Sequence, residues 1–365
     1  MLIERLLADV AGEPVRVVGT ESLGGDFAPV ERLTLATGRT VIKKWRRRDG
    51  TGWGFDPGNL RREYAGLRTL TDLGLNLCPR VLAGSDAEDT LILSDLGPGP
   101  SVVDLLHGDD PAAAERALQD VARALGRIHA AAADSEELFD SHYSSFASGE
   151  LPSDRPIPAL DDPLGEWSEV VGVFEELGFP SPRGSDLQDW LEAYSDGRFR
   201  TFVHNDLNPQ NAVCVDGGIA FVDFEGMGYR NIGIDAEFLR FPFQNYALFV
   251  PEGIRAEMER LYRAELADTL WSDESTFRSF MAVGLAFFTI RICCGIRRVA
   301  DEDQSAPSAR RRRVRLSGLV VATLDALTEA GAFPGLAAWL GDVLAEAQAR
   351  WREVTGPPEY FPAFR

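Results

Sequence analysis

The stretch that decides the fold is Phe202-Val203-His204-Asn205-Asp206-Leu207-Asn208-Pro209-Gln210-Asn211, followed by Phe221-Val222-Asp223-Phe224-Glu225. The first part has the spacing His-x-Asp-x-x-x-x-Asn, and the second ends an apolar, strand-like run on an aspartate. Between them, Asp216-Gly217-Gly218 predicts the turn of a hairpin with strands at 212–215 and 219–224. Alone, the first part could be an Asn/Asp-rich turn. The correctly placed aspartate after the hairpin disfavours that interpretation.

This layout resembles the catalytic and metal-binding loops of the protein-kinase-like fold. It is most similar to the aminoglycoside phosphotransferase and choline/ethanolamine kinase superfamily, through His-Asn-Asp-Leu at 204–207 and Asp-Phe-Glu-x-x-Gly-Tyr at 223–229. The resemblance is clearest over 202–243. It implies an α+β, bilobal fold, with a small antiparallel-sheet N-terminal lobe at residues 1–96 and a larger, mainly helical C-terminal lobe at residues 97–365.

Phosphoryl transfer requires groups that position the reactants and neutralise charge. Asp206 is the expected catalytic residue, because a carboxylate must orient the acceptor hydroxyl and accept its proton. Asn211 and Asp223 are the expected Mg²⁺ ligands, since magnesium takes a few hard oxygen ligands together with phosphate and water. Glu225 is a further candidate ligand of the metal.

Two residues receive structural roles from the resemblance. His204 is expected to hold the catalytic loop by hydrogen bonds. Asp235, in Gly233-Ile234-Asp235-Ala236, resembles a family aspartate that braces this loop.

Lysine is almost absent from the chain. Of 37 basic residues only Lys43 and Lys44 are lysines, on a predicted strand at 40–45. Strand alternation places them on opposite faces. Because Val-Ile-Lys resembles the strand signature of the family, Lys43 is expected to hold the nucleotide phosphates and Lys44 to face solvent. Glu63, in the predicted helix that begins near residue 60, resembles the glutamate that pairs with such a lysine.

Two loops complete the expected nucleotide site. Gly24 and Gly25 lie in a turn-rich segment that would cover the phosphates, since glycines let backbone N–H groups approach oxygen atoms closely. Ser94 and Leu96 lie in a segment that would bind adenine through backbone groups. A buried strand and turn would explain the latter segment equally well.

Composition sets limits on the function. The 365 residues are 45% hydrophobic and carry a formal net charge of −20, so we expect no nucleic-acid partner. The most apolar stretch, 280–296, is interrupted by Arg291, and we expect a buried helix and no membrane association. The four cysteines fit neither zinc nor disulfide spacing, so we expect reduced thiols and a cytoplasmic location.

The remaining chain is predicted to be mainly helical. Helices are expected at 112–132, 167–177, 187–194, 254–266, 274–297, 314–329 and 336–355. The run Arg310–Arg313 is interpreted as a solvated helix start, or as a place where the acidic surface is locally neutralised.

Together these features predict an ATP- and Mg²⁺-dependent phosphotransferase, with GTP not excluded as the donor. The leading acceptor is the hydroxyl of a small cationic molecule, such as an aminoglycoside-like antibiotic or an amino alcohol. Neutral or sugar-like molecules and a Ser/Thr side chain of a peptide are the alternatives, and a catalytically dead nucleotide-binding scaffold is a further one. The cationic acceptor rests on carboxylates and aromatic residues expected near the site: Asp161, Asp162, Glu166, Glu169, Glu175, Glu176, Asp235, Glu237, Trp167, Trp190, Tyr229 and Tyr246.

Overall fold

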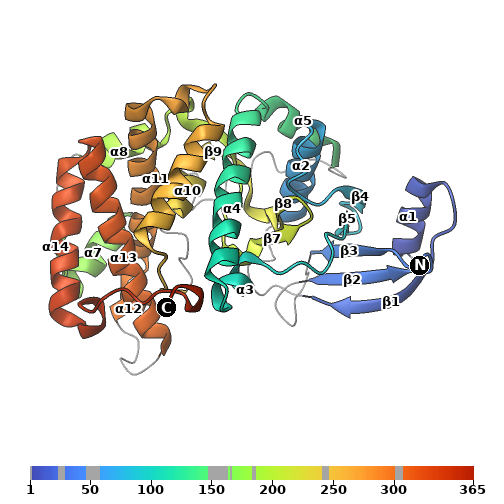
Figure 1. Ribbon diagram of the computed structural model, residues 1–365. Helices are drawn as coiled ribbons and strands as arrows, with labels where there is room; N and C mark the ends of the chain where they lie inside the picture. Colours follow the sequence, from blue (N-terminus) through green and yellow to red (C-terminus); the bar gives the residue numbers. More distant parts are fainter. Residues whose placement is uncertain are drawn as a thin grey trace.

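The computed structural model describes residues 2–23, 29–46, 58–146, 163–164, 167–182, 186–240, 246–300 and 307–365. At one end lies an antiparallel sheet of five strands in the order β1-β2-β3-β5-β4, and helices build most of the remainder (Figure 1). The strands are β1 Val17–Ser22, β2 Val30–Leu35, β3 Thr40–Trp45, β4 Val81–Ser85 and β5 Thr90–Ser94. This arrangement confirms the predicted α+β, kinase-like fold.

The two faces of the sheet are covered by different helices. Helix α1, Leu2–Ala11, packs on one face, where Leu7, Val41 and Ile92 belong to a small apolar core. Helix α2, Asn59–Asp72, lies on the other face, where Leu91 and Leu93 join the main core of the protein. The sequence analysis expected one helix in this lobe and missed α1, although its leucines recur at helical spacing.

The helical lobe contains two further short sheets around the predicted hairpin. β6 pairs with β9, and β7 pairs with β8. These strands and the 3₁₀ turns beside them are β6 Arg200–Val203, η3 Pro209–Asn211, β7 Ala212–Val215, β8 Gly218–Phe221, η4 Phe224–Gly226 and β9 Gly228–Asn231. The hairpin confirms the predicted turn at 216–218.

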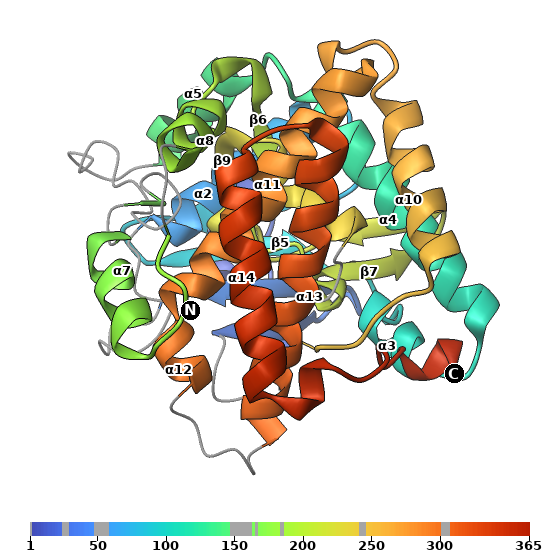
Figure 2. The same ribbon diagram turned by 90° about the vertical axis from the view of Figure 1, so that its left-hand side faces the viewer.

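Helices surround this hairpin unit, with α13 and α14 side by side and α11 behind them (Figure 2). The predicted helices are confirmed with two differences. The segment 274–297 breaks at Gly295 into two helices, and the segment 336–355 is α-helical only to Arg350, after which a 3₁₀ turn spans Arg352–Val354. The helices of the lobe are α3 Val102–His107, α4 Pro111–Ala131, α5 Glu136–Phe146, α7 Trp167–Glu176, α8 Asp186–Tyr194, α9 Gly233–Ala236, α10 Glu252–Glu265, α11 Glu274–Cys294, α12 Ile296–Ala300, α13 Pro307–Ala330 and α14 Pro334–Arg350. Short 3₁₀ turns are η2 Gly197–Phe199, η5 Glu237–Leu239, η6 Leu270–Ser272, η7 Arg352–Val354 and η8 Pro362–Phe364.

Helix α11 is the apolar segment singled out in the sequence. Among the described residues it alone is long and apolar enough to cross a membrane, and 67% of its most apolar window is buried inside the protein. Its neighbours include α13, α9 and α8. Such burial is typical of a core helix.

Helix α9 lies against α11 by direct backbone contact. A Cβ atom at Gly284 would lie only 2.0 Å from the carbonyl oxygen of Gly233, and one at Gly233 would lie 2.3 Å from that of Phe280. No side chain fits at either position without moving one of the helices. The two glycines therefore fix the position of α9, which carries Asp235.

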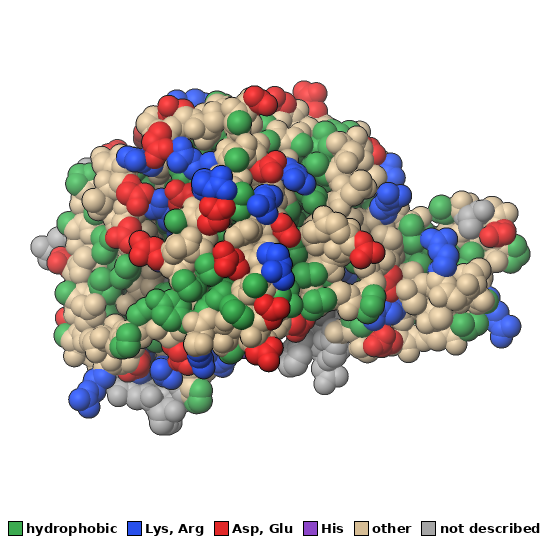
Figure 3. All heavy atoms as spheres, viewed as in Figure 1, with side chains coloured by type: hydrophobic (Ala, Val, Ile, Leu, Met, Phe, Trp, Pro, Cys, Tyr) green, Lys and Arg blue, Asp and Glu red, His purple; other side chains and the backbone are tan. Residues whose placement is uncertain are grey.

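The interpretation of Arg310–Arg313 as a solvated helix start is wrong for Arg313, which is 1% exposed. Its Nε donates to the carbonyl of Val299 and its Nη1 pairs with Glu353 at 2.8 Å. Elsewhere the surface carries interleaved acidic and basic side chains on the face in Figure 3.

Candidate active site

The loop from His204 to Asn211 leaves β6 and leads into β7. Asp235, which is 1% exposed, accepts hydrogen bonds from the backbone N–H groups of His204 at 2.5 Å and Asn205 at 2.8 Å. The ring of His204 donates from Nε2 to the carbonyl of Val222 at 2.9 Å, directly after β8. The structure therefore places His204 and Asp235 where they hold the loop on both sides.

Asp206 stands at the exposed tip of this loop. Its carboxylate accepts hydrogen bonds from the side-chain amides of Asn208 and Asn211, the latter at 3.1 Å. Asn211 also donates to the Asp206 carbonyl at 2.9 Å. The two amides fix the orientation of the carboxylate while leaving it accessible. Asn208 was missed in the sequence, where only the second amide of the motif was assigned.

Two residues beside these groups have strained backbone conformations. Asn205 and Asp223 both have left-handed backbone conformations, with φ of 69° and 67°. Asn and Asp tolerate this region better than most residues, yet it carries a cost that the surrounding structure must stabilise. At Asp223 the turn directs the carboxylate away from β8 and toward β3.

Lys44 connects the sheet to the hairpin. Its Nζ atom lies 2.7 Å from Glu63 Oε2 on α2 and 2.7 Å from Asp223 Oδ1. Lys44 and Glu63 are 8% and 1% exposed. These contacts join the two parts of the expected nucleotide site.

The expectation that Lys44 faces solvent is therefore wrong, and Lys43 is the more exposed of the two lysines. Lys43 pairs with Glu31 of the neighbouring strand at 3.1 Å and lies over the ring of Trp45. A shift of one residue along a strand reverses every side chain. The Val-Ile-Lys pattern does not show which of the two adjacent lysines faces α2. Helix α1, which was not predicted, packs on the face of Val41 and Lys43 and forms a separate apolar core there.

Burial and charge act together on these groups. Burial opposes the charge of Lys44, but Asp223, Glu63 and Glu225 outweigh it and raise its pKa. Lys44 holds the pKa of Asp223 below its usual value, despite burial. Desolvation, followed by the charge of Asp223, raises the pKa of Glu225 to about 7.

The pKa of Asp206 is also raised, first by desolvation and then by Asp223 and Asp235, although His204 and the amide of Asn211 act in the opposite direction. Asp206, Asp223 and Glu225 thus form a group of carboxylates whose charges repel one another. Lys44 alone does not relieve this repulsion at Glu225.

A divalent cation fits this donor set. Asp223 is held ionised, the amide of Asn211 has an oxygen to offer, and the crowded carboxylates would be relieved by added positive charge. Within the described ranges no three His, Cys, Asp or Glu side chains form a ready-made metal cage. Magnesium commonly takes one or two protein ligands and completes its shell with phosphate oxygens and water.

Arg62 joins α2 to the same turn and was not predicted from the sequence. It is 6% exposed and its Nε donates to the Glu225 carbonyl at 2.8 Å. Beside it, Gly66 leaves room for the side chain of Met227, whose sulfur would be 2.9 Å from a Cβ there. Helix α2 therefore positions both Glu63 and the backbone that follows Asp223.

The remaining expected nucleotide contacts divide into two groups. Gly24 and Gly25 lie outside the described residues. Ser94 ends β5. Its backbone N–H donates to the carbonyl of Arg80 at 2.8 Å, and its hydroxyl oxygen accepts from the backbone N–H of Arg80 at 2.9 Å. Leu96 follows Asp95, whose carboxylate is fixed by Arg32 at 2.7 Å and by the N–H of Gly97 at 2.9 Å. The segment of Ser94 and Leu96 is thus held in a defined turn.

The family model described as "Phosphotransferase enzyme family" matches residues 22–267, which is more than half of the chain and includes every group above. The chain belongs to this family. It is a phosphotransferase, as the sequence predicted. No curated protein matches the sequence.

Several solved structures are similar to this chain in fold. One is assigned as a fructosamine-3-kinase from Thermobifida fusca, with 16% identity, 88% of this chain and 98% of that chain covered, and a TM-score of 0.50. A choline kinase from Cryptosporidium parvum has 13% identity, 90% and 93% coverage and a TM-score of 0.47. An aminoglycoside phosphotransferase from Alicyclobacillus acidocaldarius has 12% identity, 92% coverage of both chains and a TM-score of 0.46. At these identities the likeness concerns the fold alone.

Proposed function

We propose that this phosphotransferase moves the γ-phosphoryl group of ATP to a hydroxyl of a small molecule, with Mg²⁺ as the cofactor. The observation that carries the proposal is the bridge of Lys44 to Glu63 and Asp223, both at 2.7 Å, beside a loop that presents Asp206. A buried ammonium held between two carboxylates is a preformed contact for phosphate oxygens.

Each residue has a distinct task in this reaction. Lys44 contacts the phosphates of the donor, and Glu63 keeps its ammonium in place. Asp206 accepts a hydrogen bond from the acceptor hydroxyl and takes its proton as the new bond to phosphorus forms. Because its pKa is raised, its basicity is closer to the working pH than that of an ordinary aspartate.

Asn211 and Asp223 would hold the magnesium ion, with Glu225 as a further ligand. The ion supplies positive charge to the transferred phosphoryl group. The presence of Lys44, Glu63, Asp206, Asn211 and Asp223 in one network argues against a catalytically dead scaffold, which would not require all of them.

The cationic acceptor receives no support from several of the residues on which it was based. Trp190 is 0% exposed and donates to the backbone of Val283, and Tyr229 is 4% exposed and donates to that of Ala132. Asp235 is occupied by the catalytic loop. Asp161, Asp162 and Glu166, and the side chain of Glu169, lie outside the described part of the chain. A small-molecule acceptor remains the proposal, and a Ser/Thr peptide remains the alternative.

The proposal is tested by measuring transfer of the terminal phosphate from ATP to a panel of alcohols and peptides, with and without Mg²⁺. Asp223→Asn should abolish the Mg²⁺-dependent transfer. Asp216→Asn, the same change at the exposed hairpin turn, is the matched control and should leave it unchanged. Equal activity of the two variants would contradict the assignment of Asp223.

A further inference from the structure

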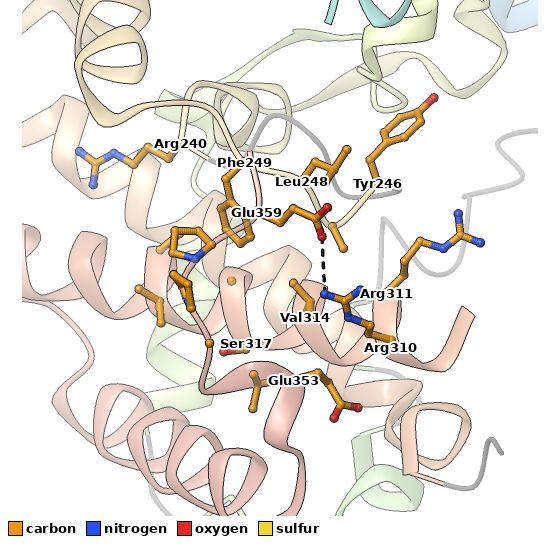
Figure 4. Close-up of a pocket in the computed structure, with 18 of the residues that line it drawn as sticks. Arg240, Tyr246, Leu248, Phe249, Arg310, Arg311, Val314, Ser317, Glu353 and Glu359 are labelled. Carbon is orange, nitrogen blue, oxygen red and sulfur yellow. Dashed lines mark ion pairs between the residues drawn. The ribbon is translucent and has the colours of Figure 1, made fainter. Parts of the chain in front are cut away.

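A cavity of about 770 Å³ lies in the helical lobe, between the segment that follows residue 245, helix α13 from Pro307 to Asp325, and the C-terminal segment (Figure 4). Its apolar lining includes Leu248, Phe249, Val314 and Val321. Cavities of this size accommodate small organic molecules. The described catalytic groups do not line it, so it requires an explanation of its own.

The polar lining of this cavity is basic, although the chain carries a net charge of −20. Five arginines and three carboxylates contribute to it: Arg240, Arg255, Arg310, Arg311, Arg365, Asp325, Glu353 and Glu359. Glu353 is engaged by the buried Arg313 outside the lining, at 2.8 Å. Arg310 and Arg365 share a single carboxylate, Glu359, at 3.5 and 2.7 Å. Arg240 is paired with Glu259 and Glu329 outside the lining, at 3.0 and 2.6 Å. Four arginines then face Asp325 and Glu359 in the lining, so the balance of charge inside the cavity is positive.

Two of these arginines have unused hydrogen-bonding capacity. Arg311 is exposed, extends from α13 beside Arg310 and forms no ion pair with the described residues (Figure 4). The Nε atom of Arg255 is buried without a hydrogen-bond partner in the described part of the chain. A buried donor of this kind is costly unless a further group accepts from it.

The position of the arginines on α13 is itself unfavourable. Arg310 and Arg311 are the fourth and fifth residues of a 24-residue helix, near the end where the helix dipole is positive. Cations here oppose the dipole and repel one another. Such a conflict with local preference is typical of a functional site, where it is offset by a bound ligand.

The cavity adjoins the catalytic loop. Tyr246 lines it and donates its hydroxyl to Gln210 Oε1 at 2.7 Å, four residues after Asp206. His107, also in the lining, contacts the rings of Tyr246 and Phe361 in tilted and edge-on geometry. It belongs to α3, which packs on η3 of the same loop. The lining is thus connected to the loop by two neighbouring elements.

We propose that this cavity binds the acceptor, and that the acceptor is a hydroxy compound with an apolar body and an anionic group, such as a carboxylate. This inference rests on the proposed function, since it takes Asp206 as the residue that meets the hydroxyl. The apolar lining contacts the body of the acceptor, and the arginines bind its anionic group by charge-assisted hydrogen bonds.

The test uses three alcohols of equal chain length that differ only in their end group: 8-hydroxyoctanoate, its neutral amide and 8-amino-1-octanol. Phosphorylation of each is measured in the purified full chain with ATP and Mg²⁺, and binding of octanoate, which has no hydroxyl, is measured by calorimetry. We expect octanoate to bind and the hydroxy acid to have a KM at least about tenfold lower than the amide, as one charge-assisted hydrogen bond allows.

The matched variants are Arg310→Ala/Arg311→Ala and the control Arg116→Ala/Arg198→Ala, which removes two exposed arginines outside the lining. The first should raise the KM for the hydroxy acid and the Kd for octanoate about tenfold or more, with little change in kcat or in the KM for ATP. The control should change neither constant. Arg310→Lys/Arg311→Lys, which keeps the charges, should recover part of the affinity and guards against misfolding.

Two results would overturn the inference while leaving the proposed function standing. One is preferred phosphorylation of the amine or the amide, and the other is octanoate binding that does not respond to Arg310→Ala/Arg311→Ala. Failure of the proposed function looks different: ATP with Mg²⁺ would not bind, or no alcohol or peptide would be phosphorylated. If octanoate binds but no alcohol or peptide is phosphorylated, the cavity binds anions without serving as an acceptor site, and the inference is overturned as well.

Discussion

The two faces of the small sheet use neighbouring lysines in opposite ways. On the face toward α2, Lys44 is buried and its charge is shared by Glu63 and Asp223, which lie far apart in the sequence. On the face that α1 partly covers, Lys43 is about one-fifth exposed and pairs with Glu31 on the adjacent strand. The first pair connects two parts of the molecule, whereas the second belongs to one sheet. The strand motif does not show which lysine is buried between two carboxylates; the contacts of each lysine do.

The largest loss of activity is expected at Asp206, the residue that meets the acceptor beside the network of Lys44, Glu63 and Asp223 on the α2 face. Asp206→Asn keeps the size of the side chain but removes its basicity, so kcat should fall by about 10²–10⁴ while the affinity for ATP stays nearly unchanged. Turnover assays and nucleotide binding on the same preparation measure both. A near-normal kcat would show that the network on the α2 face serves another purpose.

Substituting the two lysines one at a time tests whether they differ in function. Lys44→Met should lower kcat or raise the KM for ATP by about 10²-fold, because a preorganised positive charge is lost at the phosphates. Lys43→Met should behave as a surface substitution, since exposed ion pairs contribute about 0–1 kcal/mol.

Loss of Lys44 also leaves Glu63 buried without its cation, which destabilises the fold. The double variant Lys44→Met/Glu63→Gln removes both charges and separates folding from catalysis. If it folds normally and remains inactive, the role of Lys44 in catalysis is supported. The reverse order of effects at residues 43 and 44 would mean that the pairing in solution differs from the one described.

The smallest expected effect is a change in stability with pH that comes from Glu225, the carboxylate next to Asp223 in the site. With a pKa raised from 4.5 to about 7, Glu225 holds a proton in the folded protein at pH values where it is ionised in the unfolded chain. Its contribution to stability is therefore present below about pH 4.5 and is lost as the pH rises through about 7.

Glu225→Gln should remove this loss. In the absence of metal, the Tm difference between the variant and the parent should grow by a few degrees in favour of the variant between pH 5 and pH 8. Glu13→Gln, at an exposed position, is the control and should show a constant difference. A pH-independent difference for Glu225→Gln would contradict the raised pKa.

The catalytic loop could be predicted from the sequence because its chemistry is local. Asp206, Asn211 and His204 lie within eight residues, and the turn before Asp223 is encoded by glycines. These short-range constraints leave few conformations, and the hairpin at 212–221 has the expected form.

The choice between the lysines could not be made in the same way. Which face of β3 is turned toward α2 depends on what covers the other face, and that is decided by α1, thirty residues earlier in the chain. The leucine spacing of α1 was present in the sequence but was not used. Asn208 and Arg62 were missed for a related reason: an amide or guanidinium becomes informative only when its acceptor is known.

The basic cavity was further from what a sequence can show. The run Arg310–Arg313 was visible, but three of its members have different surroundings. Arg313 is buried against Glu353, Arg310 shares Glu359 with Arg365, and Arg311 extends beside Arg310. Only the return of the C-terminal segment brings these groups together. Charge counted along the chain therefore favoured a cationic acceptor, whereas charge counted around the cavity favours an anionic one.

The contact of Gly233 with Gly284 has a consequence for how mutations in this protein should be interpreted. Because the backbones of α9 and α11 are in contact at these glycines, the close approach fixes the position from which Asp235 binds the backbone of His204. A single methyl group in the middle of a core helix would be transmitted to the catalytic loop as a displacement. Sites that are chemically silent and distant from any substrate can thus act as mechanical determinants of turnover, and evolution can adjust the rate of this enzyme from inside its core.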